Sequence, residues 1–387
     1  MSPAVIDRRY NFTRRILHVQ PRPPTRLHLS VESSALKVER GRHLPAVSAT
    51  DVTILRELLA PDAATVSGTR LAKQLGISRV AVWMQLQKLT RQGFVFAARR
   101  SRGYRLVKTP VTLHAGLVQA YLSGRLCSVL NPSKGPAQLI CLDTVDSTNS
   151  EAERLLASGA AVPLVILAGA QTAGRGRRGR VWHSPPAGNL YSTFVFRPRV
   201  EPARLQDFTL WMGLNICELV SNFAKIEPGL KWPNDLFVNG RKAGGMLTEA
   251  RIDADQVRDL VFGLGLNLNG RAAALPRDLQ KTATSLADAT GAPLDLNRFA
   301  AALIGRVLSA YDQFIEGTHR DKFADLWKRY DVLRGQPVRV TQGTRTVAGT
   351  ATGIDNEGSL IVRLNSGRSE RFRAGEVTLA RESTPVA

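Results

Sequence analysis

Hydrophobic residues recur at helical spacing in three short segments between residues 51 and 91, which predicts three amphipathic helices. Their apolar positions are Val52, Leu55, Leu58 and Leu59 in the first segment, Leu71, Ala72 and Leu75 in the second, and Val82, Leu86 and Leu89 in the third. We expect Asp51, Ser67 and Ser78 to cap the three N-termini, since short polar side chains accept hydrogen bonds from the first free amides of a helix. Gly93 is placed to end the third helix.

The turn Gly76-Ile77-Ser78 separates the second and third helices, and two short strand patterns, 94–98 and 103–107, follow them. Helix, helix, glycine turn, helix and a basic hairpin predict a winged helix-turn-helix domain at residues 49–110. The candidate DNA contacts are Arg79, Gln85 and Lys88 on the third helix and Arg99, Arg100 and Arg102 in the hairpin. A small helical dimerisation module is the alternative, and the pattern leaves Trp83 open as a core residue or a contact.

From residue 111 onward the pattern alternates between apolar strand runs and amphipathic helices, which is typical of a mixed α/β (α+β) domain. The expected strands are 138–142, 164–170, 192–197, 236–238 and 262–267, and the expected helices are 113–124, 148–158, 207–224, 297–316 and 320–330. Asn239-Gly240 indicates a type I′ hairpin. Short strands with glycine turns at 338–380 predict a small SH3-like β-barrel. We therefore expect a flexible extension at 1–48, the helix-turn-helix at 49–110, the α/β domain at 111–333 and the barrel at 334–387.

Charge is distributed unevenly along the 387 residues, whose net charge is +21. Residues 1–50 hold nine Lys/Arg against three Asp/Glu, and residues 51–110 hold eleven against three. A basic end of this kind indicates nucleic-acid binding. The Arg- and Pro-rich stretch 1–48 also has the composition of an organelle transit peptide, but the helix-turn-helix pattern behind it favours a flexible basic extension.

The three cysteines and six histidines show no metal-ligand spacing, and an odd thiol count fits a reducing compartment. No apolar run approaches the roughly 20 residues of a membrane span. These features predict a cytoplasmic protein without a membrane segment and without a bound structural metal.

The stretch 174–180, with the sequence GRGRRGR, lies between two predicted strands. Its glycines allow close backbone approach to a ligand, and its arginines supply planar donors for phosphate and carboxylate oxygens. The stretch lacks the following Lys-Ser/Thr of a Walker loop and the following helix of a dinucleotide fingerprint. A flexible basic arm that holds RNA is the alternative, although the stretch occurs only once and has aromatic and β-branched neighbours.

Three motifs, DSTN at 146–149, GRGRRGRVWHSPPAGNLY at 174–191 and KWPNDLFVNGRKAGGML at 231–247, occur in this order. Together they resemble biotin–protein ligase, and the N-terminal helix-turn-helix makes residues 51–382 similar to the bifunctional form that also represses the biotin operon. This resemblance implies an ATP-dependent biotin–[acetyl-CoA-carboxylase] ligase that makes biotinyl-5′-adenylate with Mg²⁺. It further implies transfer of biotin to a lysine of a biotin carboxyl carrier protein, a homodimer when the adenylate is bound, and operator DNA as a partner.

The resemblance also implies roles for individual residues. The biotin-binding set would be Ser147, Thr148, Asn149, Gln171, Arg175, Gly176, Arg177 and Lys242. The ATP- or adenylate-binding set would be Arg177, Arg180, Trp182, Asn234 and Asn267. The catalytic set would be Arg177, Lys242 and Asp235. Taken alone, Ser147-Thr148-Asn149 is explained by helix capping and Lys242 by a solvated hairpin.

Positive charge at this site suits the implied chemistry, because the biotin carboxylate and the α-phosphate of ATP repel each other. Asp235 is the candidate to orient the acceptor lysine or take its proton. The segment 270–281, rich in Ala and bearing Pro, is expected to be mobile and to order over the adenylate. Two functions stay open for the chain as a whole: a ligase that is also a repressor, and a ligase whose helix-turn-helix does not regulate biotin genes.

Overall fold

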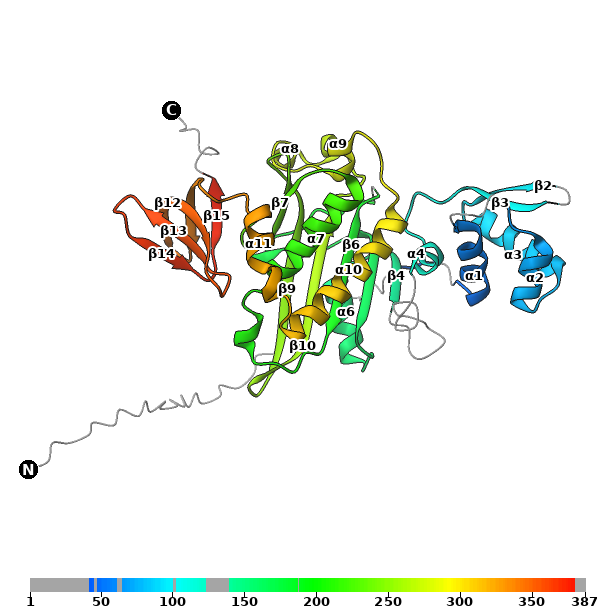
Figure 1. Cartoon of the computed structure of the whole chain (residues 1–387), viewed down its shortest axis with the longest axis horizontal. Helices are drawn as coiled ribbons and strands as arrows, with labels where there is room; N and C mark the ends of the chain where they lie inside the picture. Colours follow the sequence, from blue (N-terminus) through cyan, green and yellow to red (C-terminus); the bar gives the residue numbers. More distant parts are fainter. Residues whose placement is uncertain are drawn as a thin grey trace, which may run out of the picture. The chain divides into compact units, whose positions relative to one another are not determined.

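The computed structural model describes residues 42–44, 47–60, 65–99, 102–122, 139–186 and 188–379, and Figure 1 shows their arrangement along the chain. The N-terminal helices are α1 (Ala49–Leu59), α2 (Gly68–Leu75) and α3 (Arg79–Arg91), followed by the hairpin β2 (Val95–Arg99) and β3 (Gly103–Lys108). Gly76 ends α2 with φ 65°, and Ser78 caps α3 by accepting a 3.1 Å hydrogen bond from the amide of Ala81. The predicted helix-turn-helix and its wing are confirmed.

The first helix begins earlier than the sequence pattern predicted. Its N-cap is Ser48, whose hydroxyl accepts from the amide of Asp51, while the Asp51 carboxylate accepts from the amide of Ser48. Asp51 is therefore the third helical residue of a capping box and not the N-cap that we expected. Serine and aspartate are both common N-cap residues, so the sequence alone does not tell which of the two caps the helix.

The central domain is built on an eight-stranded sheet with the order β1-β4-β5-β6-β10-β9-β8-β7. Its strands are β1 (Arg42–His43), β4 (Leu139–Val145), β5 (Leu164–Gln171), β6 (Leu190–Phe196), β7 (Pro228–Lys231), β8 (Asp235–Val238), β9 (Arg241–Asp253) and β10 (Gln256–Leu266). Among these described strands, only β4 and β5 pair in parallel. Asn239 and Gly240 both have positive φ, 51° and 73°, which fits the type I′ hairpin that the sequence indicates between β8 and β9.

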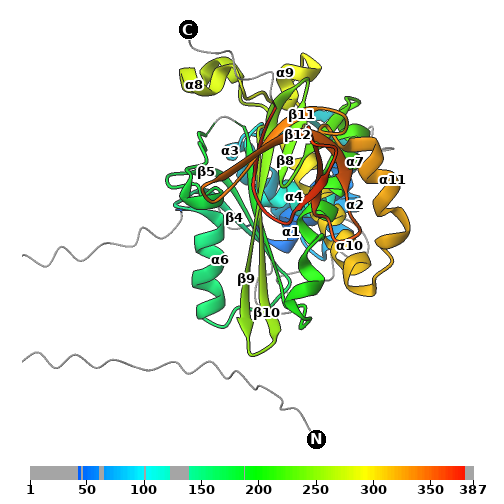
Figure 2. The same ribbon diagram turned by 90° about the vertical axis from the view of Figure 1, so that its left-hand side faces the viewer.

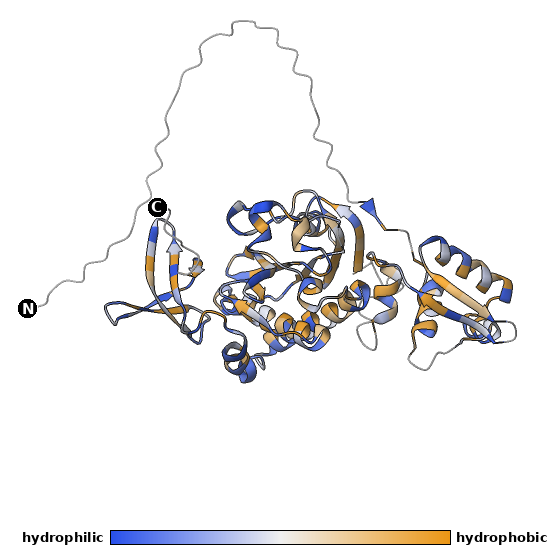
Figure 3. Cartoon of the chain, turned by 90° about the horizontal axis from the view of Figure 1, so that it is seen from above, coloured by the Kyte–Doolittle hydropathy of each residue, from blue (hydrophilic) through white to orange (hydrophobic). Residues whose placement is uncertain are grey.

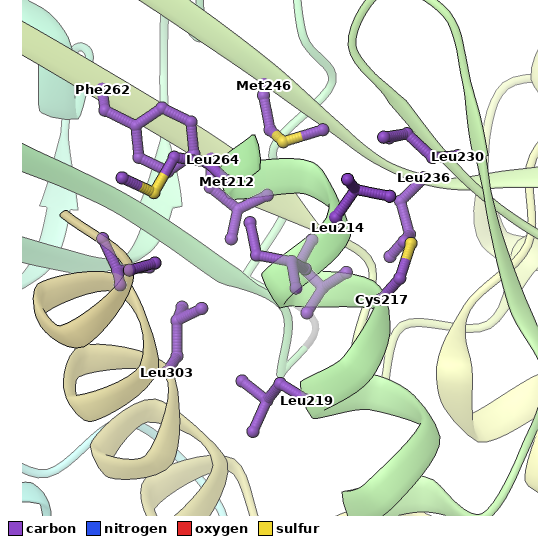
Figure 4. Packing of buried hydrophobic residues seen from close by; sticks show 14 of the residues in the cluster. Met212, Leu214, Cys217, Leu219, Leu230, Leu236, Met246, Phe262, Leu264 and Leu303 are labelled. Atoms are coloured by element: carbon purple, nitrogen blue, oxygen red, sulfur yellow. The ribbon is translucent and has the colours of Figure 1, made fainter. Parts of the chain in front are cut away.

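Helices cover both faces of this sheet, as Figure 2 shows, with α6 (Thr148–Ala157) on one side and α7 (Phe208–Ala224) with α10 (Leu296–Glu316) on the other. Alternate residues of β5 divide between the two cores: Val165 and Leu167 pack in the core under α7 and α10, while Ile166 packs in the core under α6. In Figure 4, Met212 and Leu214 of α7 lie among Leu236, Met246 and Leu303 from the strands and α10. Two covered faces explain why the strands read as continuous apolar runs. Along the helices of Figure 3, orange and blue stretches alternate, as amphipathic helices require.

Part of the stretch that we expected to be a flexible extension lies at the edge of the sheet. Arg42 and His43 form β1, which pairs antiparallel with β4. The Leu44 amide donates to the carbonyl of Cys141 at 3.3 Å. The flexible-extension prediction is therefore wrong for residues 42–44.

The remaining elements of the central domain are α4 (Ala115–Tyr121), α8 (Arg277–Gln280), α9 (Leu286–Thr290) and α11 (Arg320–Tyr330), with short 3-10 turns η2 (Arg177–Gly179), η3 (Pro202–Leu205) and η4 (Ala272–Ala274). The segment 270–281 thus carries two helical turns that its composition did not indicate. Within the described part of the chain, no helix combines the length and hydrophobicity of a membrane crossing.

The C-terminal domain is a five-stranded antiparallel sheet, in the order β14-β13-β12-β11-β15. Its strands are β11 (Pro337–Gln342), β12 (Arg345–Ile354), β13 (Leu360–Leu364), β14 (Ser369–Phe372) and β15 (Glu376–Leu379). The small β-rich domain that the sequence predicts is confirmed, and the strand pairs of its described residues form an open order with β14 and β15 at the two edges.

Candidate ligand-binding site

The loop that follows β5 is a tightly wound hairpin. The Trp182 amide donates to the carbonyl of Gly174 at 2.8 Å, and the Gly176 amide donates to the carbonyl of Arg180 at 2.7 Å. A Cβ on Gly174 would lie 2.5 Å from the Trp182 carbonyl oxygen, so only glycine allows this closure. Arg178 turns the chain with φ 56°. A closed hairpin of this kind argues against the flexible RNA-holding arm.

A cavity of about 320 Å³ lies against this hairpin. Its lining contains every residue that the resemblance assigns to biotin or nucleotide, except Asn267. Five cationic side chains, Arg175, Arg177, Arg180, Lys231 and Lys242, meet only two carboxylates in this lining, those of Asp235 and Glu376. The excess of positive charge suits an anionic ligand.

Glycines on two neighbouring strands make room for the indole of Trp182. A Cβ on Gly265 of β10 would lie 2.4 Å from the indole Nε1, and one on Gly245 of β9 would lie 3.0 Å from Cζ3. Gly245 and Gly265 are paired across β9 and β10, so the indole lies over a strip of bare backbone. The indole nitrogen is buried against this strip without a hydrogen-bond partner in the described structure.

Polar side chains from the start of α6 form another wall of the cavity. Ser147 is the N-cap residue of α6, but its hydroxyl makes no capping hydrogen bond. The Thr148 amide donates to Gln171 Oε1 at 2.9 Å, which ties the helix to the end of β5. Asn149 accepts from the Thr193 hydroxyl at 2.7 Å and donates to Glu249 at 2.8 Å. Capping alone therefore does not explain these residues, because their side chains face the cavity rather than the helix amides.

The charged and polar groups around Lys242 and Arg177 come from three segments. Lys242 Nζ lies 2.7 Å from Asp235 Oδ1 and 5.2 Å from the Trp182 ring centroid. Arg177 donates to Asn234 Oδ1 at 2.9 Å. Burial, followed by the nearby charge of Arg178, lowers the pKa of the Arg177 guanidinium. Such a cation lacks sufficient counter-charge, so an anion entering the cavity would stabilise it.

Two acidic residues at the site, Glu249 and Glu376, were not predicted from the sequence. Glu376 of β15 forms ion pairs with Arg180 and, at 4.0 Å, with Arg178. Glu249 of β9 binds Asn149 and pairs with Arg175 at 2.6 Å. The Gly/Arg hairpin is therefore anchored by carboxylates from β9 and from the C-terminal sheet, which are remote from it in sequence.

Asn267 lies outside the cavity lining, and its side-chain amide donates to the carbonyl of Thr284 at 3.0 Å. In this structure the Asn267 side chain therefore stabilises the neighbouring chain at Thr284 and does not line the cavity. Among the described residues, no three His, Cys, Asp or Glu side chains converge as metal ligands. The two carboxylates of the cavity are already paired with Lys242 and Arg180, so the residues do not fit a metal ion held by protein ligands alone.

The predicted DNA-contact residues fall into two groups. Arg79, Arg99 and Arg102 are exposed. Lys88 instead bonds the buried carboxylate of Asp51 at 2.8 Å, and Gln85 is half-buried with its side-chain oxygen shielded from solvent. Arg100 lies outside the described residues.

A mixed α/β sheet with a glycine-floored cavity ringed by cations defines a protein that binds anionic ligands. Residues 141–267 match the Biotin/lipoate A/B protein ligase family, residues 334–379 the Biotin protein ligase C terminal domain, and residues 52–105 an HTH domain. The bifunctional ligase/repressor BirA of Bacillus subtilis (strain 168) is 31% identical over 312 residues, which cover 80% of this chain and 92% of that protein. BirA of Escherichia coli (strain K12) is 29% identical over 316 residues, covering 81% and 92%.

A structure of the biotin protein ligase from Aquifex aeolicus in complex with biotin and ATP is 27% identical, covers 62% of this chain and 98% of that one, and has a TM-score of 0.54. The chain belongs to the biotin–protein ligase family in its bifunctional ligase/repressor form. The resemblance stated from the three sequence motifs is thereby confirmed.

Proposed function

We propose that this chain is a biotin–[biotin carboxyl carrier protein] ligase that activates biotin with ATP, and that it also represses transcription when it holds the adenylate. One observation carries the ligase half: the cavity brings Arg177, Lys242 and Trp182 together over the glycine strip of β9 and β10. Relatives named as bifunctional ligase/repressors support both halves.

In the proposed complex, the wall formed by α6 and Gln171 binds the biotin head group. Ser147 and Thr148 offer hydroxyls, and Asn149 offers an amide that Glu249 and Thr193 already orient. Trp182 and Asn234 contact the nucleotide, while Arg175 places side-chain donors along the acyl-phosphate and Gly176 leaves room for it beside the backbone. Arg180 then reaches the phosphates.

In the activation step, a carboxylate oxygen of biotin attacks the α-phosphorus of ATP, the bond to the bridging oxygen breaks and pyrophosphate leaves. The two reacting groups are anions, so their approach needs positive charge. Arg177 and Lys242 supply it from two separate segments and stabilise the charge that develops at phosphorus. Mg²⁺ enters this proposal as the counter-ion that ATP brings with it.

In the transfer step, the free amine of the acceptor lysine attacks the acyl carbon and AMP leaves. A lysine of ordinary pKa, about 10.4, is mostly protonated at neutral pH. Asp235 is the one carboxylate of the lining that lies beside Lys242, 2.7 Å from its ammonium. We assign to Asp235 the orientation of the incoming amine or the removal of its proton.

Arg177→Ala tests the assignment of the adenylate site. The variant should form biotinyl-5′-AMP more slowly and release what it forms into solution, because one of the cations that hold the acyl-phosphate is gone. The released adenylate is measured by chromatography of the filtrate after ultrafiltration. Retention of the adenylate at the unmodified level would remove Arg177 from the site.

The repressor half is tested by a gel shift with the promoter of the chain's own biotin-synthesis genes, with and without biotin plus ATP. A single winged helix buries too little surface for tight binding, so we propose a homodimer formed with the adenylate bound. Binding should need both substrates and coincide with dimerisation in analytical ultracentrifugation. A monomeric protein that ignores the promoter under both conditions would leave a ligase whose helix-turn-helix does not regulate biotin genes.

A further inference from the structure

The outward face of α3 is apolar where a DNA-reading helix usually carries hydrogen-bonding groups. Val80, Trp83 and Met84 are 65%, 51% and 58% exposed. Of the eight large hydrophobic side chains recorded as exposed in the described ranges, these three lie within five consecutive residues. We refer to Val80, Trp83 and Met84 as the α3 patch. Clustered exposed hydrophobic residues of this kind mark a surface that is covered in function.

The side chains of the α3 patch do not belong to the hydrophobic core of the domain. The core of the domain is already filled from α3 by Val82, Leu86 and Leu89, all nearly or fully buried. Residues 80 and 84 are one helical turn apart on the opposite side, with Trp83 beside them. The patch therefore faces outward because of its position on the helix.

The position of the α3 patch along the helix favours DNA as its occupant. Ser78 caps α3, so the patch occupies the first two turns of the helix. In helix-turn-helix proteins, the N-terminal residues of the second helix of the motif contact base edges in the major groove. Arg79 and Arg91, on the same helix, are both exposed.

The charge around the patch suits a polyanion. The domain's described carboxylates, Asp51 and Glu57, are each occupied by a cation: Asp51 by Lys88 at 2.8 Å and Glu57 by Arg70 at 2.8 Å. Residues 51–110 carry eleven Lys/Arg against three Asp/Glu. The cations around the patch are therefore available to phosphates, which disfavours an apolar protein partner without acidic groups.

Two of the polar candidates for base recognition on α3 are engaged within the domain. Lys88 is bonded to Asp51, and the Gln85 side-chain oxygen is shielded from solvent. Arg79 and Gln87 stay exposed beside the patch, so the face combines polar ends with an apolar centre. The base feature in the major groove that suits apolar surface is the 5-methyl group of thymine.

We propose that the α3 patch recognises thymine 5-methyl groups in the major groove of the operator, so that the protein selects its site by van der Waals contact as well as by hydrogen bonds. This inference rests on the repressor half of the proposed function. Burying one methyl group strengthens binding about fourfold. A dimer that contacts one methyl in each half-site would gain about tenfold or more.

The test uses the full-length protein with biotin and ATP. Duplexes that it binds are selected from a random library, and one selected sequence is then made with thymine or with deoxyuridine throughout. Uracil keeps every hydrogen-bonding group of thymine and lacks only the methyl. The wild-type protein should bind the uracil duplex about tenfold more weakly.

Two variants show whether the α3 patch causes this difference. Trp83→Ala and Val80→Ala should each reduce the ratio of the affinities for the thymine and uracil duplexes toward one. Wild type and variants are measured on the same two duplexes, so any effect of uracil on DNA shape is the same for all of them. Val107→Ala is the matched control, since Val107 is a 53% exposed valine on β3. It should keep the full ratio, and Arg102→Ala should weaken both duplexes equally.

Each other outcome counts against a distinct claim. Equal affinity of the wild type for the two duplexes overturns the methyl-recognition inference alone. A ratio that survives in Trp83→Ala and Val80→Ala, together with altered self-association, would make the patch a contact between copies of this chain. Failure to enrich any duplex, with or without biotin and ATP, would remove the repressor half of the proposed function and this inference with it.

Discussion

Replacing Lys242 with alanine perturbs the reacting end of the cavity in two ways. The ammonium of Lys242 lies 2.7 Å from Asp235 Oδ1, and in the proposed complex it meets the biotin carboxylate. Its loss removes a cation from the activation step. It also leaves the Asp235 carboxylate without its nearest counter-charge in a cavity that must accept two further anions.

The magnitude follows from the separation of the charges. Two unit charges 4 Å apart interact by about 4 kcal/mol at the effective dielectric of a partly exposed site. Removing one positioned electrostatic donor typically costs roughly 100- to 1000-fold in rate. We therefore expect Lys242→Ala to lower biotin-dependent adenylate formation by at least about 100-fold. Adding Asp235→Asn removes the uncompensated carboxylate and should restore roughly tenfold of that loss.

The assay is single-turnover formation of biotinyl-5′-AMP from labelled ATP. Lys231→Ala is the matched comparison, because Lys231 lines the same cavity but lies over the Phe237 ring, 5.0 Å from its centroid. It removes the same unit charge from the cross-strand neighbour of Asp235 but leaves the Lys242–Asp235 ion pair in place, so it should cost less than about tenfold. Near-normal activity of Lys242→Ala, or equal losses in the two lysine variants, would refute the reasoning.

Three further changes test other parts of the site. Gly265→Ala places a Cβ 2.4 Å from the Trp182 indole nitrogen and should displace the indole. The KM for ATP should then rise about tenfold or more, while the thermal unfolding temperature changes little. An unchanged KM would contradict the role of Gly245 and Gly265 in seating the indole. Glu249→Gln weakens the ion pair with Arg175 and should speed release of the adenylate, as measured by filtration; release at the normal rate would contradict this. Trypsin cleavage within residues 270–281 should slow when biotin and ATP are present, and equal rates in both states would disprove ligand-induced ordering.

The parts of the fold that follow local rules were predictable from the sequence. The turn at Gly76, the cap at Ser78 and the hairpin at Asn239-Gly240 depend on residues within a few positions of each other. The choice between Ser48 and Asp51 as the cap of α1 was not, because each satisfies the other's amide and the pattern cannot rank two good caps.

The site shows the same division between local and distant information. The sequence 174–180 predicts an anion site by itself, because its glycines and arginines are adjacent. Glu376, in contrast, contacts Arg180 from the last strand of the described chain. No spacing or composition rule links two residues so far apart. Lys88 is a similar case, since its pairing with Asp51 depends on how α1 packs in the domain.

Biotin-dependent exchange of labelled pyrophosphate into ATP tests the central claim most directly, because it reports the activation step without an acceptor protein. The full-length protein should catalyse this exchange only when biotin is present, and a biotin carboxyl carrier domain added afterwards should become labelled with biotin on one lysine. Exchange that proceeds equally without biotin, or no exchange in a protein that is folded by circular dichroism, would contradict the assignment of this cavity as a biotin-activating site.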